Sequence, residues 1–273
     1  ARKLLESTPR ELRGWEWGML MKLCLPKERE LASKQTVVKN ASFTKTGDHL
    51  ITTDSKGRLT IAEMPSGKEL FNMDGFAGAR AVAYHPTRNL LAVAKETDVA
   101  IWDVAEQEHI KTLAGEHTTP ITAVAFSPDG ANLASGETDG FIVVWTIKTQ
   151  KALRKLEGHQ GKINGLEFNH KGNQLMSASD DKTVRVWTKS SGNQRRMLAG
   201  HPGAVMSVQV APDDVHVAAG CKNGNVRIWN AKTGDVVTIL AGHQGPIKAM
   251  AFTADSERLV TGSADGAARI WKI

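Results

Sequence analysis

The sequence predicts an all-β protein of the β-propeller class, and a repeat of 42 residues is the main reason. Four histidines fall 42 residues apart, and each is followed 28 residues later by a tryptophan. Such a period is typical of propellers, because one small antiparallel sheet cannot cover its own apolar face and must stack against others. The four pairs are His117 and Trp145, His159 and Trp187, His201 and Trp229, and His243 and Trp271.

The composition narrows the class of protein further. The 273 residues are 41% hydrophobic, and no stretch approaches the roughly 18 consecutive apolar residues of a membrane span. We therefore expect no membrane insertion by this segment. The two cysteines, Cys24 and Cys221, lack the spacing of a disulfide framework or a zinc site. No nucleotide-binding or metal-binding motif occurs either, so we expect no cofactor and no metal.

The formal net charge of +6 gives little support to a nucleic-acid partner. Residues 1–34 carry eight Lys/Arg and five Asp/Glu, and their net charge of +3 is half of the total. The remainder is spread over the repeats without a basic run, and aromatic residues make up only 5% of the chain. The sequence therefore argues against direct binding to nucleic acid.

Residues 1–24 predict an amphipathic helical arm. Thr8 and Glu11 have the spacing of a capping box, and Pro9 stands at the first helical position. Pro26 stops the helical run. An apolar stripe follows the cap at helical spacing and consists of Leu12, Trp15, Met19, Leu20 and Leu23.

Four short strands are expected in each repeat. In the clearest one, alternating segments at 163–168, 174–179 and 183–187 are separated by turn residues, and an outer strand ends at Leu198. Stepping back by 42 from His117 gives Gly75, and a further 41 gives Lys34, so two degenerate repeats precede the four regular ones. The predicted propeller spans 25–273, with repeats near 34–74, 75–116, 117–158, 159–200, 201–242 and 243–273.

The last repeat ends with its third strand, so its outer strand has to come from elsewhere. Leu31 stands where Leu156 and Leu198 stand before their histidine positions. We therefore expect residues 25–32 to supply the missing strand, since closing the ring in this way removes both exposed sheet edges.

The repeats resemble the WD40-repeat family. Gly158-His159, the turn at Asp181 and the segment ending at Trp187 carry the resemblance, and the literal Trp-Asp pair stands at Trp102-Asp103. Propellers of this family most often have seven blades. The six repeats of this chain predict six blades, with seven as the alternative. Residues 11–24 resemble the linker that precedes WD repeats in bacterial Ser/Thr protein kinases of the planctomycete type, although no kinase motif occurs in this chain.

Serine or threonine, histidine and aspartate recur at fixed spacing, which allows two interpretations. A hydrolase triad uses the same residue types, but one catalytic site would not recur in several repeats. The resemblance to WD40 repeats implies instead a structural Trp–Ser/Thr–His–Asp hydrogen-bond chain in each blade. In the fifth repeat Ala219 and Asn223 replace the serine or threonine and the aspartate of this chain. The replacement is either neutral sequence drift or the sign of a looser blade that recruits a partner. The expected chains are His117, Ser135, Asp139 and Trp145; His159, Ser177, Asp181 and Trp187; His201 and Trp229; and His243, Thr261, Asp265 and Trp271.

These features favour a non-catalytic scaffold that presents loops of a rigid ring to a protein or peptide partner. Resemblance to the family implies docking on the narrow face of the ring. The candidate partner-binding residues there are Gln160, Lys162, Asp180, Lys222, Gln244 and Ala264.

Two other functions stay open at this stage. The chain begins without a methionine, so we expect a piece of a longer polypeptide whose upstream domain is a further candidate partner. One alternative is therefore a sensory or ligand-binding module of a signalling protein such as a bacterial Ser/Thr kinase, and a minor one is a propeller hydrolase. We expect a cytoplasmic location, or else an extracytoplasmic domain of a membrane-anchored parent.

Overall fold

A computed structural model describes residues 38–43, 48–64 and 66–273. The predicted helical arm at 1–24 and the predicted outer strand at 25–32 lie outside the described residues. Every regular element in the described part is a β-strand, and no helix there has the length and apolarity to span a membrane. The chain divides into two compact units, residues 1–77 and 78–273.

The first unit contains one antiparallel sheet of four strands in the order β1-β2-β3-β4. Ile51, Leu59 and Ile61 are almost fully buried and form its apolar side. Gly57 has a positive φ of 80°, and a Cβ there would lie 2.0 Å from the backbone nitrogen of Ala77, so only glycine fits this turn. The strands are β1 (Val38–Phe43), β2 (His49–Asp54), β3 (Leu59–Glu63) and β4 (Glu69–Met73).

The second unit contains five consecutive antiparallel sheets, of which the last has three strands. The prediction of an all-β chain with six repeats is thereby confirmed, since the described residues form six sheets. Its strands are β5 (Ala79–Tyr84), β6 (Leu90–Lys95), β7 (Asp98–Asp103), β8 (Glu108–Leu113), β9 (Ile121–Phe126), β10 (Asn132–Glu137), β11 (Ile142–Thr146), β12 (Lys151–Leu156), β13 (Ile163–Phe168), β14 (Gln174–Ser179), β15 (Val184–Thr188), β16 (Gln194–Leu198), β17 (Val205–Val210), β18 (His216–Cys221), β19 (Val226–Asn230), β20 (Val236–Leu240), β21 (Ile247–Phe252), β22 (Arg258–Ser263) and β23 (Ala268–Lys272).

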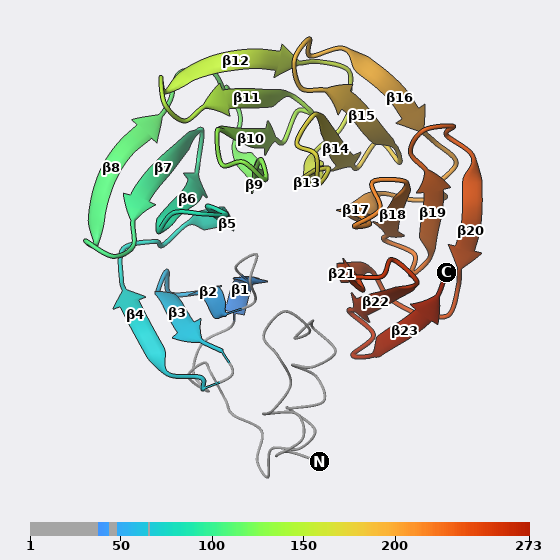
Figure 1. The fold of residues 1–273 in the computed structure, drawn as a ribbon, viewed down its shortest axis with the longest axis horizontal. Coiled ribbons are helices and arrows are strands. Elements are labelled where there is room, and N and C mark those ends of the chain that lie inside the picture. Colours follow the sequence, from blue (N-terminus) through green and yellow to red (C-terminus); the bar gives the residue numbers. More distant parts are fainter. Residues whose placement is uncertain (1–37, 44–47, 65) are drawn as a thin grey trace. The chain divides into compact units, whose positions relative to one another are not determined.

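Within the second unit the sheets stand side by side along an arc (Figure 1). The first strands β5, β9, β13, β17 and β21 line the inner side of this arc, and β8, β12, β16 and β20 form its outer side. Neighbouring first strands contact one another, so each sheet packs its face against the next sheet. This arrangement is the blade geometry of a propeller.

The apolar cores lie between the sheets rather than within them. One cluster joins Met176 and Val186 of the fourth sheet to Val208, Val217 and Trp229 of the fifth. Equivalent clusters join the second sheet to the third, the third to the fourth and the fifth to the sixth. Each sheet is therefore stabilised by its neighbours, since burial of apolar surface is the main favourable contribution to folding.

Basic side chains of the outer strands make a second, polar connection between neighbouring sheets. The Nζ atom of Lys111 on β8 donates to the Ile147 carbonyl at 2.5 Å. Arg154 on β12 donates from Nε and Nη2 to the Ser190 carbonyl, at 2.9 and 2.6 Å. Arg196 on β16 donates to the Lys232 carbonyl in the same way. Each cation thus binds the turn between the third and fourth strands of the next sheet.

Candidate functional site: the histidine networks and the loops they hold

The fourth sheet contains a complete buried hydrogen-bond chain. The Nε2 atom of His159 lies 2.7 Å from Ser177 Oγ, and its Nδ1 atom lies 2.7 Å from Asp181 Oδ2. The indole N–H of Trp187 donates to the same Ser177 Oγ at 2.8 Å. Because Ser177 accepts from the indole, its own hydroxyl hydrogen can point to His159 Nε2, which leaves the imidazole proton on Nδ1 to donate to Asp181. Burial lowers the pKa of His159, consistent with a neutral ring.

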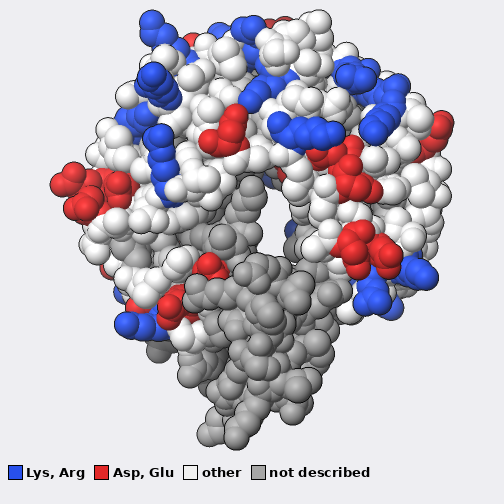
Figure 2. Space-filling model, viewed as in Figure 1, with Lys and Arg blue, Asp and Glu red and all other residues white. Residues whose placement is uncertain are grey.

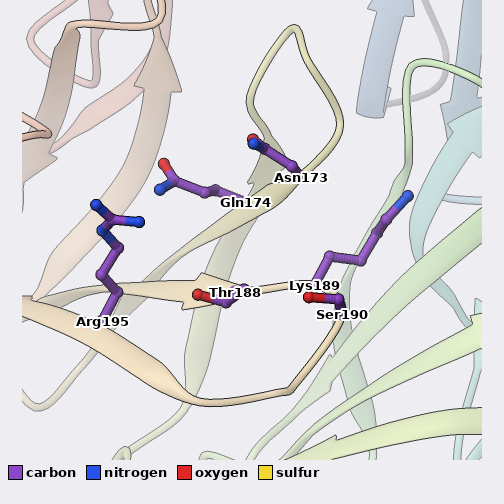
Figure 3. Close-up of a pocket in the computed structure, with 6 residues that line it drawn as sticks. All are labelled: Asn173, Gln174, Thr188, Lys189, Ser190 and Arg195. Atoms are coloured by element: carbon purple, nitrogen blue, oxygen red, sulfur yellow. The ribbon is translucent and has the colours of Figure 1, made fainter.

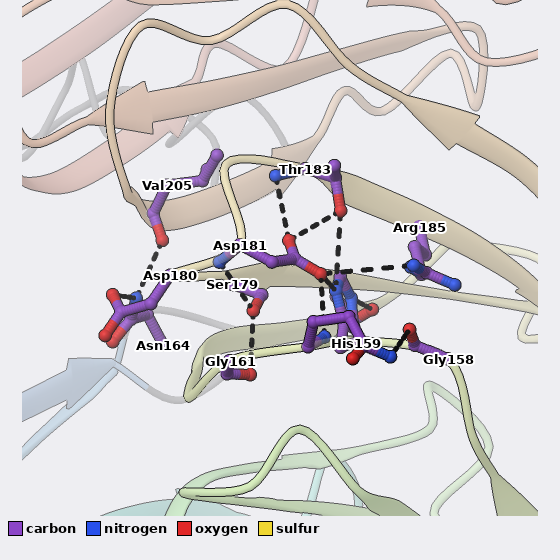
Figure 4. A network of polar contacts seen from close by, with 12 residues as sticks. Gly158, His159, Gly161, Asn164, Ser179, Asp180, Asp181, Thr183, Arg185 and Val205 are labelled. Atoms are coloured by element: carbon purple, nitrogen blue, oxygen red, sulfur yellow. Dashed lines mark hydrogen bonds and ion pairs between the residues drawn. The ribbon is translucent and has the colours of Figure 1, made fainter.

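Asp181 connects this chain to the surface loops (Figure 4). Its Oδ2 atom accepts the Gln160 amide N–H at 3.1 Å, and its Oδ1 atom accepts the Thr183 hydroxyl at 2.7 Å. Burial opposes ionisation of Asp181, but hydrogen bonds from Thr183 and His159 lower its pKa overall. The carboxylate thus fixes both the loop after His159 and the turn between β14 and β15.

The sixth sheet repeats the arrangement with threonine in place of serine. His243 lies 2.8 Å from Thr261 Oγ1 and 2.9 Å from Asp265 Oδ2. The Trp271 indole donates to Thr261 Oγ1 at 2.9 Å, and the Gln244 amide donates to Asp265 at 2.9 Å. Two sheets therefore carry the full set of contacts that the resemblance to WD40 repeats implies.

In the third sheet the prediction of Asp139 is wrong, because Glu137 occupies the acid position. Its Oε2 atom lies 2.8 Å from His117 Nδ1, while Ser135 lies 2.6 Å from Nε2 and accepts the Trp145 indole at 2.7 Å. Glu137 ends β10, and its longer side chain reaches the imidazole from two residues earlier, which leaves Asp139 exposed in the turn. The fourth and sixth sheets have serine at the position of Glu137. A glutamate there was the sequence signal that the acid of this network had changed position.

The fifth sheet keeps the histidine but not its partners. His201 is only 5% exposed, and neither ring nitrogen has a hydrogen-bond partner. Burial, together with the nearby charge of Arg227, lowers the pKa of His201 to about 4. Ala219 offers no hydroxyl, and the exposed Asn223 side chain accepts instead from the Asn225 amide at 3.2 Å.

The imidazole of the fifth sheet has moved toward its indole. The centroids of the His201 and Trp229 rings are 4.8 Å apart, compared with 6.2 Å for His159 and Trp187. This closer T-shaped ring contact means that aromatic packing partly replaces hydrogen bonding in this sheet.

The geometry of these networks supports a structural role over catalysis. The Ser177 side chain is fully buried and already binds an imidazole and an indole, so its oxygen has no access to a substrate. The same set occurs in more than one sheet. Within the described residues no group of three or more His, Cys, Asp or Glu side chains is placed to hold a metal ion.

Five of the six candidate partner-binding residues lie in loops that these networks fix, and Lys222 lies in the corresponding turn of the fifth sheet, which lacks the network. Gln160, Asp180, Lys222, Gln244 and Ala264 are exposed, and Lys162 is partly exposed. Each turn residue pairs with the loop that precedes the first strand of its own sheet: Asp180 N donates to Lys162 O, Lys222 N to Ala204 O and Ala264 N to Pro246 O, each at 2.9 Å. The six residues therefore belong to one end of three successive sheets.

Sequence reasoning missed two features that join these loops across sheets. The Asn164 amide donates to Asp180 Oδ1 at 2.7 Å and to Val205 O of the next sheet at 2.9 Å. Gly140 and Gly224 have φ values of 90°, and a Cβ at either position would lie within 2.6 Å of the carbonyl oxygen of His159 or His243, respectively. Only glycine lets these turns approach the next histidine loop so closely.

The fold and its repeated networks define a WD40-type β-propeller domain, and comparison with known families agrees. Models of the WD domain, G-beta repeat match residues 192–230 and 234–272. A family model described as "Nucleolar protein 10-like, N-terminal domain" matches residues 43–204, which is more than half of the chain. The chain belongs to this family of β-propeller domains. The family matches begin at residue 43, so the kinase-linker resemblance of residues 11–24 stays a prediction.

Individual relatives are distant, and the matches to them are short. The chain is 32% identical over 79 residues to the anaphase-promoting complex subunit cdh1 of Dictyostelium discoideum, which is 29% of this chain and 10% of that protein. It is 29% identical over 108 residues to the small ribosomal subunit protein RACK1 of Medicago sativa, which is 33% of each chain. The matched segments thus span a tenth and a third of these two relatives.

Proposed function

We propose that this domain is a non-catalytic scaffold that binds a protein or peptide partner through the loops at the histidine end of its sheets. WD40 propellers commonly serve as platforms for protein partners, and both relatives are named as components of larger assemblies. The observation that carries the proposal is that acids bound to buried histidines fix exposed loops. Asp181 and Asp265 each bind a backbone amide of the loop after their histidine, next to the exposed Gln160 and Gln244.

Fixed loops favour recognition because little conformational entropy is lost on binding. The exposed side chains at this end differ between sheets, with Lys162 and Asp180 in the fourth, Lys222 in the fifth and Ala264 in the sixth. A constant framework with variable side chains is what a selective docking surface requires.

The proposal is tested by capture of partners from host lysate on the immobilised full chain, compared with the double variant Lys162→Glu, Lys222→Glu. We expect the variant to lose the specifically captured proteins. The matched control Lys232→Glu, Lys272→Glu makes the same change in charge at exposed positions away from these loops and should retain them. Undiminished capture by the Lys162, Lys222 variant would move the docking surface elsewhere.

A second candidate is a sensory or ligand-binding module of a larger signalling protein, favoured by the resemblance of residues 11–24 to the linker of bacterial Ser/Thr kinases. Here the partner is an upstream domain of the same polypeptide. Purification of the parent protein and limited proteolysis with and without the propeller would test it, since protection of residues 11–24 requires a contact with that domain.

The location of the domain is a further part of the proposal. We place it in the cytoplasm, with an extracytoplasmic domain of a membrane-anchored parent as the alternative, and the family description adds a nucleolar setting. Imaging of the tagged parent protein in its host cell distinguishes the three.

A further inference from the structure

Charge is segregated among the outer halves of the sheets, although the net charge of the repeats is small. Residues 98–115 of the second sheet carry four Asp/Glu and one Lys. Residues 140–156 of the third sheet carry four Lys/Arg and no acid, and residues 182–200 of the fourth carry five Lys/Arg and no acid. Figure 2 shows Lys and Arg gathered over the perimeter near β12 and β16, and acids over the region of β8.

Some of these cations are already engaged within the fold. Arg154 and Arg196 bind carbonyl groups of the next sheet, Lys155 pairs with Glu116 at 2.5 Å, and Lys189 lies 3.6 Å from Asp129. Lys148, Lys151 and Arg195 are exposed and make no ion pair with any described residue. These three side chains leave positive charge uncompensated on the outer surface.

Apolar side chains lie on the same outer surface. The exposed residues of β12 are Lys151, Leu153 and Lys155, and those of β16 are Gln194, Arg195 and Met197. A β-bulge interrupts each strand, at Leu153 and at Arg195. Leu153 is 36% exposed and Met197 is 52% exposed. We call the set Lys148, Lys151, Leu153, Arg195 and Met197 the basic rim.

A pocket opens beside the turn between β15 and β16, and Arg195 of the basic rim lines it (Figure 3). Its lining contains no carboxylate and consists of Asn173, Gln174, Thr188, Lys189, Ser190 and Arg195. Arg195 and Gln174 lie at one end of the pocket in this view, and Lys189 extends away from them. The Arg154 guanidinium binds the Ser190 carbonyl, so the pocket is continuous with β12 of the neighbouring sheet.

We propose that the basic rim of the third and fourth sheets binds an acidic, extended segment of a protein partner whose leucine-like side chains contact Leu153 and Met197. Charge complementarity and the interleaved apolar side chains both fit such a segment. The hydroxyl, amide and guanidinium donors of the pocket suit a carboxylate. This surface is separate from the histidine-end loops, so the proposal stands independently of the function proposed above.

The same observations fit a nucleic acid less well. Single-stranded nucleic acids bind through aromatic side chains that stack on bases. Of the large apolar side chains that are exposed in the described part, none is aromatic. The interleaving of Leu153 and Met197 with the cations therefore favours a peptide over a phosphate backbone.

The test measures fluorescence anisotropy of a labelled peptide of about 12 residues, which spans about 40 Å when extended and alternates Glu with Leu. We expect the wild-type chain to bind it, and binding to weaken at high ionic strength. The variant Lys148→Glu, Lys151→Glu, Arg195→Glu should weaken binding by at least about tenfold. Replacing Leu153 and Met197 by Ser should weaken it by about threefold or more.

Two matched controls show whether a loss of peptide binding comes from the basic rim, from the change in net charge, or from the loops at the histidine end. The variant Lys232→Glu, Lys248→Glu, Lys272→Glu makes the same change in charge at exposed positions elsewhere, and the Lys162→Glu, Lys222→Glu variant alters the loops. Both should bind the peptide within about twofold of the wild type. Circular dichroism and thermal unfolding check that all variants are folded.

Three outcomes overturn the proposal. The first is no measurable binding of the peptide up to about 1 mM. The second is an equal loss of affinity in the control variant. The third is tighter binding of a uridine oligonucleotide of similar length with the same sensitivity to the rim variant, which would assign the surface to nucleic acid.

Discussion

Individual residues decide whether a buried imidazole stabilises this fold. In the fourth sheet both nitrogens of His159 have partners, while in the fifth sheet His201 is equally buried and has none. A buried polar atom without a partner costs free energy of about 1–3 kcal/mol. The difference between the two sheets traces to Ala219, which offers no hydroxyl to Nε2, and to Asn223, which accepts from the Asn225 amide and not from Nδ1.

Ala219→Ser should therefore stabilise the protein. A hydroxyl at this fully buried position, equivalent to Ser177, would give His201 Nε2 a partner. We expect the free energy of unfolding to rise by about 1 kcal/mol in urea denaturation. Ala218→Ser is the matched control, because that side chain lies in the apolar cluster on the other face of β18 and its hydroxyl would be buried without a partner. A loss of stability in both variants would contradict the explanation.

Glu167 on β13 should make stability fall as pH rises. Its carboxyl accepts from the Gln209 side chain at 2.5 Å and from the Val210 amide at 2.8 Å, and burial raises its pKa to about 8. Between pH 4.5 and about 8 the folded state then holds a proton that the unfolded state has lost, so the free energy of unfolding decreases with rising pH.

Glu167→Gln replaces the titratable carboxyl group by an amide and keeps the shape of the side chain. The free energy of unfolding of the variant relative to wild type should increase between pH 5 and 8, by up to about 1.4 kcal/mol per pH unit. Chemical denaturation at a series of pH values measures this difference, and because it is a difference, the titration of His201 cancels. Exposed Glu257→Gln serves as control. A pH-independent difference for Glu167→Gln would show that the carboxyl ionises normally.

At the scale of elements, neighbouring sheets are joined both by apolar clusters and by the cations of the outer strands. Lys111, Arg154 and Arg196 occur at intervals of 43 and 42 residues, and each binds a carbonyl 36 residues further along the chain. The interval is that of the repeat itself, so the contact is part of the architecture rather than a chance surface pair. In each case the hydrogen bond runs from an outer strand to the turn before the outer strand of the next sheet, so it connects neighbouring sheets.

Arg154→Ala should loosen the connection between the third and fourth sheets. Loss of its two hydrogen bonds to Ser190 O should lower the free energy of unfolding by about 1 kcal/mol and speed hydrogen exchange in the turn 188–193. Arg195→Ala removes an exposed arginine without these bonds, and we expect a change within about 0.5 kcal/mol. Equal effects of the two variants would mean that the carbonyl contact contributes nothing measurable.

At the scale of the whole molecule, the open question is what pairs with β23. In the described part of the chain the sixth sheet ends at β23, whose residues Ala268, Arg269 and Ile270 are exposed, the last by 51%. An edge strand that stays unpaired favours association with other strands. The sequence prediction that residues 25–32 supply the outer strand beside β23 stays a prediction.

Two truncations test the closure. If residues 25–32 form the outer strand, removal of 1–24 should change stability little, whereas removal of 1–32 should cost about 2 kcal/mol or more and expose β23 to hydrogen exchange. Urea denaturation and exchange of the amides at 268–272 measure both effects. Similar results for the two truncations would mean that another segment, or none, pairs with β23.

The sequence by itself determined the number of sheets, their order and the networks of the fourth and sixth sheets. The repeat period encodes these features because a short antiparallel sheet forms from contacts close in the chain, and the same residue types at the same spacing then meet in the same way. The tertiary structure alone decided that Glu137 replaces Asp139, that the His201 ring lies closer to its tryptophan, and that the outer cations bind the next sheet. Those outcomes depend on how far a side chain reaches and on what a neighbouring sheet places opposite it, and neither quantity is contained in the spacing of residues along one repeat.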